Sequence, residues 1–178
     1  SLRENIAVVF QDNFLFSDTI SNNIAFAFEE IDNESIIDAA IYADVHNNII
    51  EFNEKYETVL GERGVTLSGG QKQRVSIARA LIKNPSILIF DDSVSAVDTK
   101  TEEKILTNLR RLRSGKTTIL IAHRISTVKD LDLIILMDEG KVLDCGSHNE
   151  LLERSFEYQE MVRLQSLEEE VSGGEDNE

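Results

Sequence analysis

Short, unbroken runs of apolar residues recur along this chain, and segments long enough to form helices separate them. The runs occupy residues 5–10, 86–90, 117–122 and 131–137. A strand buried on both faces is apolar throughout, whereas a half-exposed strand alternates apolar with polar side chains. Strands that alternate with helices pair in parallel between layers of helices. The pattern therefore predicts an α/β fold whose mostly parallel sheet is covered on both faces by helices.

The segments between these runs carry apolar residues at helical spacing. Residues 71–83 predict a helix that ends before Pro85, because proline disfavours the helical conformation of the residue before it. Residues 99–113 predict a second helix, in which Thr99 and Glu102 stand at the positions of a capping box. We expect both helices to pack on the sheet.

The length and the charge of the chain limit the number of domains and the kind of partner. With 178 residues, of which 41% are hydrophobic, the chain is large enough for one compact domain. We expect this domain at residues 1–165 and an acidic, disordered tail at residues 166–178, where six carboxylates cluster. The net charge of -15 disfavours a nucleic-acid partner, because such surfaces need Lys and Arg. The one cysteine, Cys145, excludes an internal disulfide, and we expect Cys145 and Phe26 to be packing residues.

A glycine-rich motif stands directly before the first predicted helix. Residues 67–71 read Leu-Ser-Gly-Gly-Gln, in which Ser68 can cap the helix and Gln71 stands at the capping-box position. Gly69 and Gly70 let a ligand approach the backbone closely, where free N–H groups and the helix dipole attract an anion. These five residues alone fit an anion site and an ordinary glycine turn equally well.

Polar side chains follow two of the predicted strands. Asp91 and Asp92 come directly after residues 86–90, and His123 comes directly after residues 117–122. The carboxyl ends of parallel strands form the edge where ligands bind, and carboxylates are ligands for Mg²⁺, which usually carries phosphates. An isolated Asp pair or His is more often structural. Because these ends follow the glycine motif in order, we expect a phosphate-binding site.

Residues 6–164 together resemble the ATPase domain of the ABC transporter family. Residues 67–71 match its LSGGQ signature motif, and residues 87–91 look like its Walker B strand. Ser95, Ala96, Val97 and Asp98 are similar to the D-loop, His123 to the switch histidine and Gln11 to the Q-loop glutamine. The resemblance implies a P-loop NTPase-like sheet with a helical signature subdomain.

The resemblance also implies how the site residues act. Two such domains would form a head-to-tail dimer with ATP between them. Ser68, Gly69, Gly70 and Gln71 would then contact the γ-phosphate of the ATP held by the partner domain. Asp91 and Gln11 would bind Mg²⁺, and the γ-phosphate would be contacted by His123. Gln11 would also sense the attacking water.

Two further segments resemble the exporters within this family. Residues 58–64 look like the exporter X-loop, in which Glu62 and Arg63 would touch the membrane domain, and Phe14–Leu15–Phe16 also resembles exporter sequences. This resemblance implies a transmembrane domain as a partner and a place at the cytoplasmic face of the cell membrane. The expected function is ATP-driven export of a drug or lipid-like molecule.

The sequence departs from the family in its phosphate loop. No G-x-x-x-x-G-K-[ST] motif occurs in the chain, since Arg110 stands where the first glycine would precede Gly115 and Lys116. We expect the chain to be cut off before the Walker A strand and loop. We also expect no meaningful ATP turnover by these residues alone.

The second departure is Asp92, because the family usually has Glu as the general base at this position. Asp is shorter by one carbon–carbon bond, ~1.5 Å, and a base misplaced by ~1 Å can cost about 10²-fold in rate. We expect a degenerate site in a heterodimer, in which the intact motif at residues 67–71 serves the site of the partner. The alternative is a homodimer in which Asp92 is an adequate base.

Two other classes of function remain open from the sequence. One is a soluble ABC-type ATPase that acts on nucleic acid or the ribosome, which the acidic charge and residues 58–64 disfavour. The other is a non-catalytic module that binds nucleotide and holds a dimer together, which Asp92 favours. Asp91, His123 and Gln11 instead favour retained nucleotide chemistry.

Overall fold

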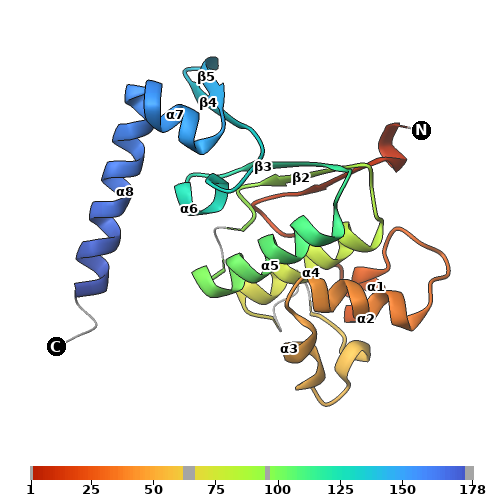
Figure 1. The fold of residues 1–178 in the computed structure, drawn as a ribbon. Helices are drawn as coiled ribbons and strands as arrows, with labels where there is room; N and C mark the ends of the chain where they lie inside the picture. Colours follow the sequence, from red (N-terminus) through yellow and green to blue (C-terminus); the bar gives the residue numbers. More distant parts are fainter. Residues whose placement is uncertain (1, 62–66, 95–96, 175–178) are drawn as a thin grey trace. The chain divides into compact units, whose positions relative to one another are not determined.

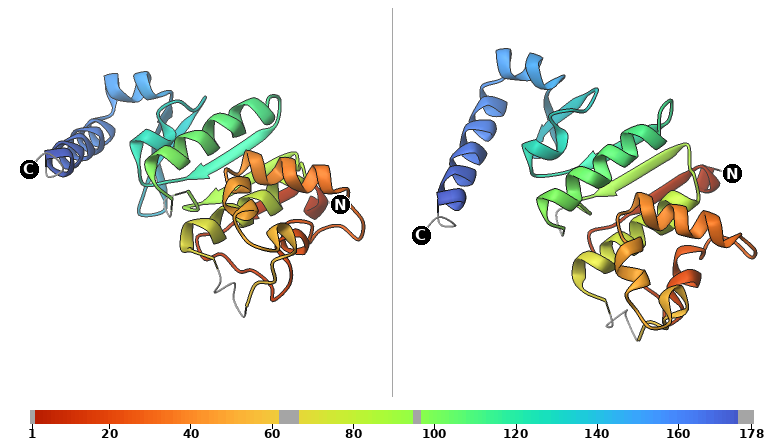
Figure 2. Two further views of the ribbon diagram at one scale, coloured as in Figure 1. Left: turned by 90° about the horizontal axis from the view of Figure 1, so that it is seen from below. Right: turned by 60° about the horizontal axis from the view of Figure 1, so that its bottom comes forward.

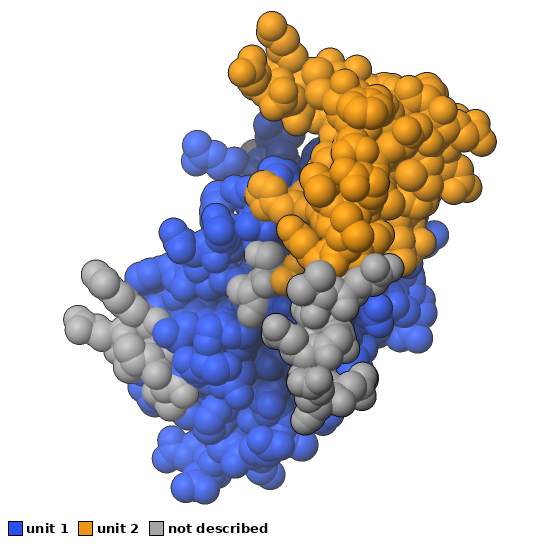
Figure 3. Space-filling model, turned by 90° about the vertical axis from the view of Figure 1, so that its left-hand side faces the viewer, with its two compact units in different colours: residues 1–121 blue, residues 122–178 orange. Residues whose placement is uncertain are grey.

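The computed structural model describes residues 2–61, 67–94 and 97–174 (Figure 1). The chain forms two compact units, residues 1–121 and residues 122–178, which Figure 3 shows in blue and orange. Each unit has its own hydrophobic core. The boundary between them does not coincide with the domain end expected at residue 165, which stays a prediction.

Within the described residues of unit 1, three parallel strands form the sheet, in the order β1-β2-β3. They are β1 (Ile6–Val9), β2 (Ile87–Asp91) and β3 (Thr117–Ile121). Val9 lies beside Phe90, and Phe90 lies beside Leu120. Each strand starts and ends within one residue of an apolar run in the sequence. The predicted α/β fold with a parallel sheet is therefore confirmed.

Two long helices and a group of shorter ones complete unit 1. α4 (Gly69–Ile82) and α5 (Thr99–Leu112) agree with the predicted helices. α1 and α2 both pack against α4, and the three lie side by side in Figures 1 and 2. This group is the helical subdomain that the resemblance implies. The shorter elements are α1 (Ile20–Ile24), α2 (Asn33–Tyr42), α3 (His46–Ile50) and the 3-10 helices η1 (Leu2–Glu4) and η2 (Lys55–Glu57).

The core of unit 1 lies between the helices and one face of the sheet. Leu88 and Phe90 point into it and have no exposed surface. On the other face, Val8, Ile119 and Ile121 keep 37%, 45% and 48% of their surface exposed. The prediction of cover on both faces is wrong for the described residues of this unit, because the alternate side chains of β1 and β3 meet solvent instead of a helix.

Asp98 caps α5. Its Oδ1 accepts a hydrogen bond from the Thr101 backbone N–H at 3.0 Å. The predicted capping box of Thr99 and Glu102 is therefore wrong by one residue at its start. The Asp98 carboxylate reaches the free N–H groups of the first turn and carries a charge that the helix dipole favours.

In its described residues, 122–174, unit 2 consists of a β-hairpin and three helices. β4 and β5 pair antiparallel, and Leu136, Leu151 and Tyr158 pack into a core beside them. Cys145, expected to be a packing residue, is exposed on β5, so that expectation is wrong. The elements are α6 (Ile125–Val128), β4 (Ile134–Asp138), β5 (Lys141–Gly146), α7 (His148–Arg154) and α8 (Phe156–Gly174).

Helix α8 continues past residue 165, where we expected the acidic tail to begin. The first part of that tail is thus helical in the structure, and its disorder stays a prediction. In the described ranges of the chain, no helix combines the length with the apolar character that crossing a membrane requires.

We expect the substitution Leu88→Ala to lower the free energy of unfolding of the chain by about 2–5 kcal/mol, because it leaves a cavity in a fully buried site. The control Ile41→Ala, at a helix position that is 46% exposed, should cost no more than about 0.5 kcal/mol. Urea unfolding followed by circular dichroism measures both. Equal losses would contradict the position of the core.

The pKa of Asp98 lies below its ordinary value of 3.8, because the Thr101 side chain and backbone N–H both donate to the carboxylate. A lowered pKa means that the carboxylate contributes to stability above about pH 4 and that this contribution is lost as the pH falls through the folded-state pKa. We expect Thr101→Val to raise the pKa of Asp98 toward 3.8. Carboxyl carbon chemical shifts measured against pH test this, and an unchanged titration would contradict it.

Candidate functional site

The amino end of α4 presents the Leu-Ser-Gly-Gly-Gln motif at the surface. Ser68 Oγ accepts a hydrogen bond from the Gln71 backbone N–H at 3.2 Å, and Gln71 Oε1 accepts one from the Ser68 N–H at 3.0 Å. The expected capping box is therefore confirmed. Ser68 and Gly69 are exposed. The motif thus directs backbone N–H groups and the positive end of a 14-residue helix toward solvent.

The packing of the described residues does not require a glycine at position 69. A Cβ atom placed on it would meet nothing within 4 Å. Its backbone is the first residue of α4, a conformation that any L residue adopts. The absence of a side chain at Gly69 therefore lets a group from outside the chain approach the backbone closely.

Gln11 and Asp92 meet at the carboxyl ends of the strands. Gln11 Nε2 donates to Asp92 Oδ2 at 3.4 Å, although the two residues are 81 positions apart. The Asp92 backbone N–H donates to the Ile121 carbonyl at 3.0 Å, which fixes the turn after β2 to the end of β3. The predicted site residues Gln11 and Asp92 are thus brought together by the parallel register.

Asp92 has a left-handed backbone, with a φ of 45°. Few residues other than glycine adopt this conformation, and Asp is among those that tolerate it. Residues held in such conformations cluster at functional sites, where the surrounding structure fixes them. This conformation turns the chain sharply at the end of β2 and fixes the direction of the Asp92 side chain.

Asp91 and Gln11 fit the requirements of a Mg²⁺ ion that also binds phosphate. Both are exposed at this edge of the sheet. Because the Gln11 amide nitrogen donates to Asp92, its amide oxygen is the atom that can coordinate a cation. Among the described residues, no three His, Cys, Asp or Glu side chains converge as a metal site. A cation here would take its other ligands from phosphate and water, which is how proteins usually hold Mg²⁺.

His123 belongs to unit 2 and follows the end of β3 by two residues. Its side chain is exposed, and its carbonyl accepts a hydrogen bond from Gln165 Nε2 at 2.6 Å. The Gln165 Oε1 in turn accepts from the Ile125 N–H at 2.7 Å. Helix α8 therefore fixes the backbone around His123 through one glutamine, a contact that the sequence did not predict.

Three other predicted site residues, Ser95, Glu62 and Arg63, lie outside the described residues. The fourth, Asp98, lies at the start of α5, and the positive charge of Arg74 helps to lower the pKa of its carboxylate.

Arg74 connects the signature motif to the cap of α5. Its Nε donates to the Gly70 carbonyl at 3.2 Å, and its guanidinium also binds the carbonyl of Asp44 and lies 3.8 Å from the Asp44 carboxylate. Burial lowers the pKa of Arg74, and the charges of Asp44 and Asp98 oppose this shift. No pattern in the sequence marked this role of Arg74, although Arg74 stands four residues after Gly70, one helical turn along.

A pair of amides, buried at Gln73 and partly buried at Asn13, joins the segment after Gln11 to α4. Asn13 Nδ2 donates to Gln73 Oε1, and Gln73 has no exposed surface. Polar side chains in a core are almost always hydrogen-bonded, because an unpaired polar group is costly there. No sequence pattern marked these two residues, which are 60 positions apart.

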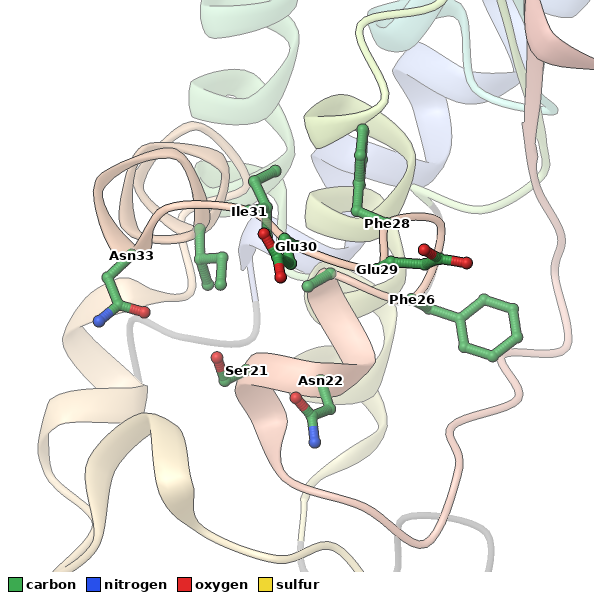
Figure 4. A pocket seen from close by; sticks show the side chains of 10 residues that line it. Ser21, Asn22, Phe26, Phe28, Glu29, Glu30, Ile31 and Asn33 are labelled. Atoms are coloured by element: carbon green, nitrogen blue, oxygen red, sulfur yellow. The ribbon is translucent and has the colours of Figure 1, made fainter.

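A pocket of about 350 Å³ lies between α1 and the start of α2, away from these residues. Figure 4 shows Ser21, Asn22, Asn33 and the carboxylates of Glu29 and Glu30 around it. Two carboxylates disfavour phosphate through like-charge repulsion. The pocket is therefore not a candidate nucleotide site.

Comparisons with known proteins agree with this geometry. The ABC transporter family model matches residues 1–95. The chain is 48% identical over 168 residues to the multidrug resistance-like ATP-binding protein MdlA of Escherichia coli, covering 94% of this chain and 28% of that protein. It is 44% identical over 171 residues to the ATP-dependent lipid A-core flippase of Syntrophus aciditrophicus, covering 96% and 28%.

The fold matches a solved structure described as a bacterial Atm1-family ABC exporter with ATP bound. The TM-score is 0.90 and the identity 46%, over 93% of this chain and 29% of the exporter chain. This chain thus spans between a quarter and a third of the length of the relatives named here. The family model covers more than half of the 178 residues, and the signature helix and the strand-end carboxylates agree with it. The chain therefore belongs to the ABC transporter family.

Proposed function

We propose that this chain is the ATP-binding motor domain of an ABC exporter, which couples ATP binding and hydrolysis to the export of a drug or lipid-like molecule. One observation carries the proposal. The capped amino end of α4 is exposed, and none of the described residues fills the space beside Gly69. A second domain that carries ATP is the occupant that suits this end, because its phosphates match the N–H groups and the dipole.

In this proposal, residues of one domain act on ATP bound by the other. The N–H groups of Gly69 and Gly70 and the Ser68 hydroxyl donate to the γ-phosphate, with Gln71 holding Ser68 in position. Negative charge that develops on the phosphate during hydrolysis is stabilised by these fixed donors. Ser95 and Asp98 of the D-loop would lie at the same dimer interface.

The strand-end residues act on the nucleotide of their own domain. Asp91 and Gln11 would hold Mg²⁺, which supplies charge neutralisation of the phosphates when bound. Asp92 would accept the proton of the attacking water, and His123 would donate to the γ-phosphate. The hydrogen bond from Gln11 orients the Asp92 carboxylate beside the cation ligands.

The length of the Asp92 side chain supports an asymmetric dimer. An aspartate reaches ~1.5 Å less far than the family's usual glutamate, and the Gln11 hydrogen bond together with the fixed backbone limits how far it can move. We infer that the site containing Asp92 is degenerate. The intact Ser68–Gln71 motif would then complete the active site of a different partner chain.

The membrane partner follows from the relatives and not from this chain. MdlA and the lipid A-core flippase are named for multidrug resistance and lipid transport. By analogy, Glu62 and Arg63 would contact a transmembrane domain of the same transporter at the cytoplasmic face of the cell membrane. A drug or lipid-like substrate follows from the same analogy.

The first test replaces Asp92 with Glu in the full-length parent protein, purified alone in lipid nanodiscs. We expect the wild-type protein to hydrolyse ATP slowly and Asp92→Glu to raise the rate about tenfold or more, because the longer carboxylate reaches the attacking water. A phosphate-release assay measures the rates. The 178-residue chain serves as a second control and should show no saturable hydrolysis.

Dimer formation with ATP has to be verified for the wild-type and the Asp92→Glu proteins, since a chain that does not dimerise would not hydrolyse ATP whatever residue stands at position 92. Brisk hydrolysis by the wild-type dimer would refute the degenerate site. Slow hydrolysis by both proteins, although they dimerise, would favour a non-catalytic module.

The second test concerns the space at Gly69. We expect Gly69→Ala to leave the thermal unfolding midpoint of the parent protein unchanged, because the added methyl group meets no described residue. We expect the same substitution to reduce ATP hydrolysis by the assembled dimer about tenfold or more, because the methyl group displaces the partner's nucleotide. Gly115→Ala is the matched control, since Gly115 has a φ of 77° and lies in a turn. This control should lower the free energy of unfolding by about 1–2 kcal/mol. The rate of ATP hydrolysis per folded dimer should stay at the wild-type value. A Gly69→Ala protein that hydrolyses ATP at the wild-type rate would contradict the proposed interface.

A further inference from the structure

The short segment that joins the end of β3 to the start of α6 is bound by one side chain from α8. The segment consists of Ala122, His123 and Arg124. Gln165 Nε2 donates to the His123 carbonyl at 2.6 Å, and Gln165 Oε1 accepts from the Ile125 N–H at 2.7 Å. One amide group therefore holds the backbone on both sides of Arg124.

The two hydrogen bonds are ones that a glutamine can make and a glutamate cannot. Arg124 is extended, with a φ of -101° and a ψ of 130°, so the His123 carbonyl and the Ile125 N–H both face the amide. A primary amide carries a donor and an acceptor, whereas an ionised carboxylate only accepts. The bridge thus depends on the chemistry of residue 165 as well as on its length.

Both ends of the bridge are anchored in the core of unit 2. Tyr158, Val162 and Gln165 are four and three positions apart, so they share one face of α8. Tyr158 is 1% exposed, and Val162 packs against the same core. Ile125, at the other end of the bridge, belongs to that core too. Packing therefore fixes the amide and the backbone that it binds.

The bridge holds the backbone of His123 and leaves its ring accessible. Gln165 binds the His123 carbonyl, and the His123 side chain is exposed. Which rotamers a side chain can adopt depends on the backbone conformation that carries it. Because a hydrogen bond weakens steeply when its angle falls below about 120°, a fixed backbone matters for a ring that has to donate to a phosphate.

We propose that Gln165 is a positioning residue that holds His123 in the direction from which its ring reaches the γ-phosphate. The inference rests on the proposed function, in which His123 donates to that phosphate. It goes further, because it gives α8 a part in nucleotide recognition although α8 carries none of the motifs found in the sequence. Gln165 acts through the backbone of His123 and not by contact with the nucleotide.

The experiment compares two nucleotides that differ in the γ-phosphoryl group. The affinities of the full-length parent protein for AMP-PNP, a non-hydrolysable analogue of ATP, and for ADP are measured by equilibrium dialysis in lipid nanodiscs with Mg²⁺. We expect Gln165→Ala to lower the affinity for AMP-PNP about threefold or more and to keep the affinity for ADP within about twofold of wild type. An equal loss of both affinities would refute the role of Gln165, because a general structural defect does not distinguish the two nucleotides.

Gln159→Ala is the matched control on the same helix. Gln159 is also partly buried, and its Nε2 donates to the Leu152 carbonyl at 2.7 Å. Each substitution therefore removes a glutamine amide from a backbone carbonyl. We expect Gln159→Ala to keep the wild-type ratio of the two affinities. A fall in this ratio as large as that of Gln165→Ala would show an effect of α8 as a whole and refute the specific role of Gln165.

The double variant His123→Ala/Gln165→Ala tests whether Gln165 acts through His123. We expect His123→Ala alone to lower the affinity for AMP-PNP about tenfold or more, because a hydrogen bond to a charged group is lost. In that background, Gln165→Ala should lower the affinity by less than about twofold further, since the ring that it positions is gone. A further loss of full size would contradict the inference.

The outcomes separate the inference from the proposed function. If His123→Ala changes neither affinity, the proposed contact of His123 with the γ-phosphate fails, and the inference fails with it. If His123→Ala lowers the affinity for AMP-PNP alone and Gln165→Ala does not, the role of Gln165 is refuted while the proposed function stands.

A second variant covers the case in which Gln165→Ala fails to fold. Gln165→Glu keeps the length of the side chain and the acceptor for the Ile125 N–H, but it loses the donor to the His123 carbonyl. We expect the same selective loss of AMP-PNP affinity, about threefold or more. Gln159→Glu controls for the added negative charge on α8, and an equal fall in the ratio of affinities in both variants would refute the role of Gln165.

Discussion

The packing of α4 against the sheet and the helices beside it is the constraint on which the rest of unit 1 depends. Val75, Ile77 and Ala78 have no exposed surface, so the middle of this helix is fixed in the core. Its amino end carries the glycine motif to the surface, and its later turns carry Arg79 to the carbonyl of Phe14. A rigid helix of 14 residues therefore connects the proposed nucleotide contact with the segment around Phe14 and Asn23.

The strand ends contribute a second fixed element. The parallel register sets the end of β1 beside the end of β2, so Gln11 and Asp92 meet although they are distant in sequence. The left-handed turn at Asp92 and its backbone hydrogen bond to β3 fix a short carboxylate where the family usually has a longer one. Small differences in reach matter there, because proton transfer depends steeply on distance. The proposed asymmetry of the dimer follows from this combination of a fixed backbone and a short side chain.

Much of the fold and part of the site could be predicted from the sequence. Unbroken apolar runs indicated the three parallel strands, and Ser68 and Gln71 indicated the capping box, because both patterns reflect local backbone chemistry. The cap of α5 was misplaced by one residue, since Asp98 and Thr99 are both good caps and only the folded turn decides between them. The open face of the sheet and the exposure of Phe26 were missed, because burial depends on which elements pack on a surface and not on the apolar character of the residue.

The sequence by itself determined the order of the elements, the motif before α4 and the aspartate in place of glutamate, since these depend on residue type and spacing. Tertiary structure decided which distant groups meet. Asn13 and Gln73, Arg74 and Asp44, and Arg79 and Asn23 are pairs separated by 60, 30 and 56 residues. Long polar side chains bind whatever oxygen the packing of helices and strands brings within hydrogen-bond distance, and no local pattern specifies that partner. The contact between the signature helix and the segment around Asn23 therefore became visible only in the folded chain.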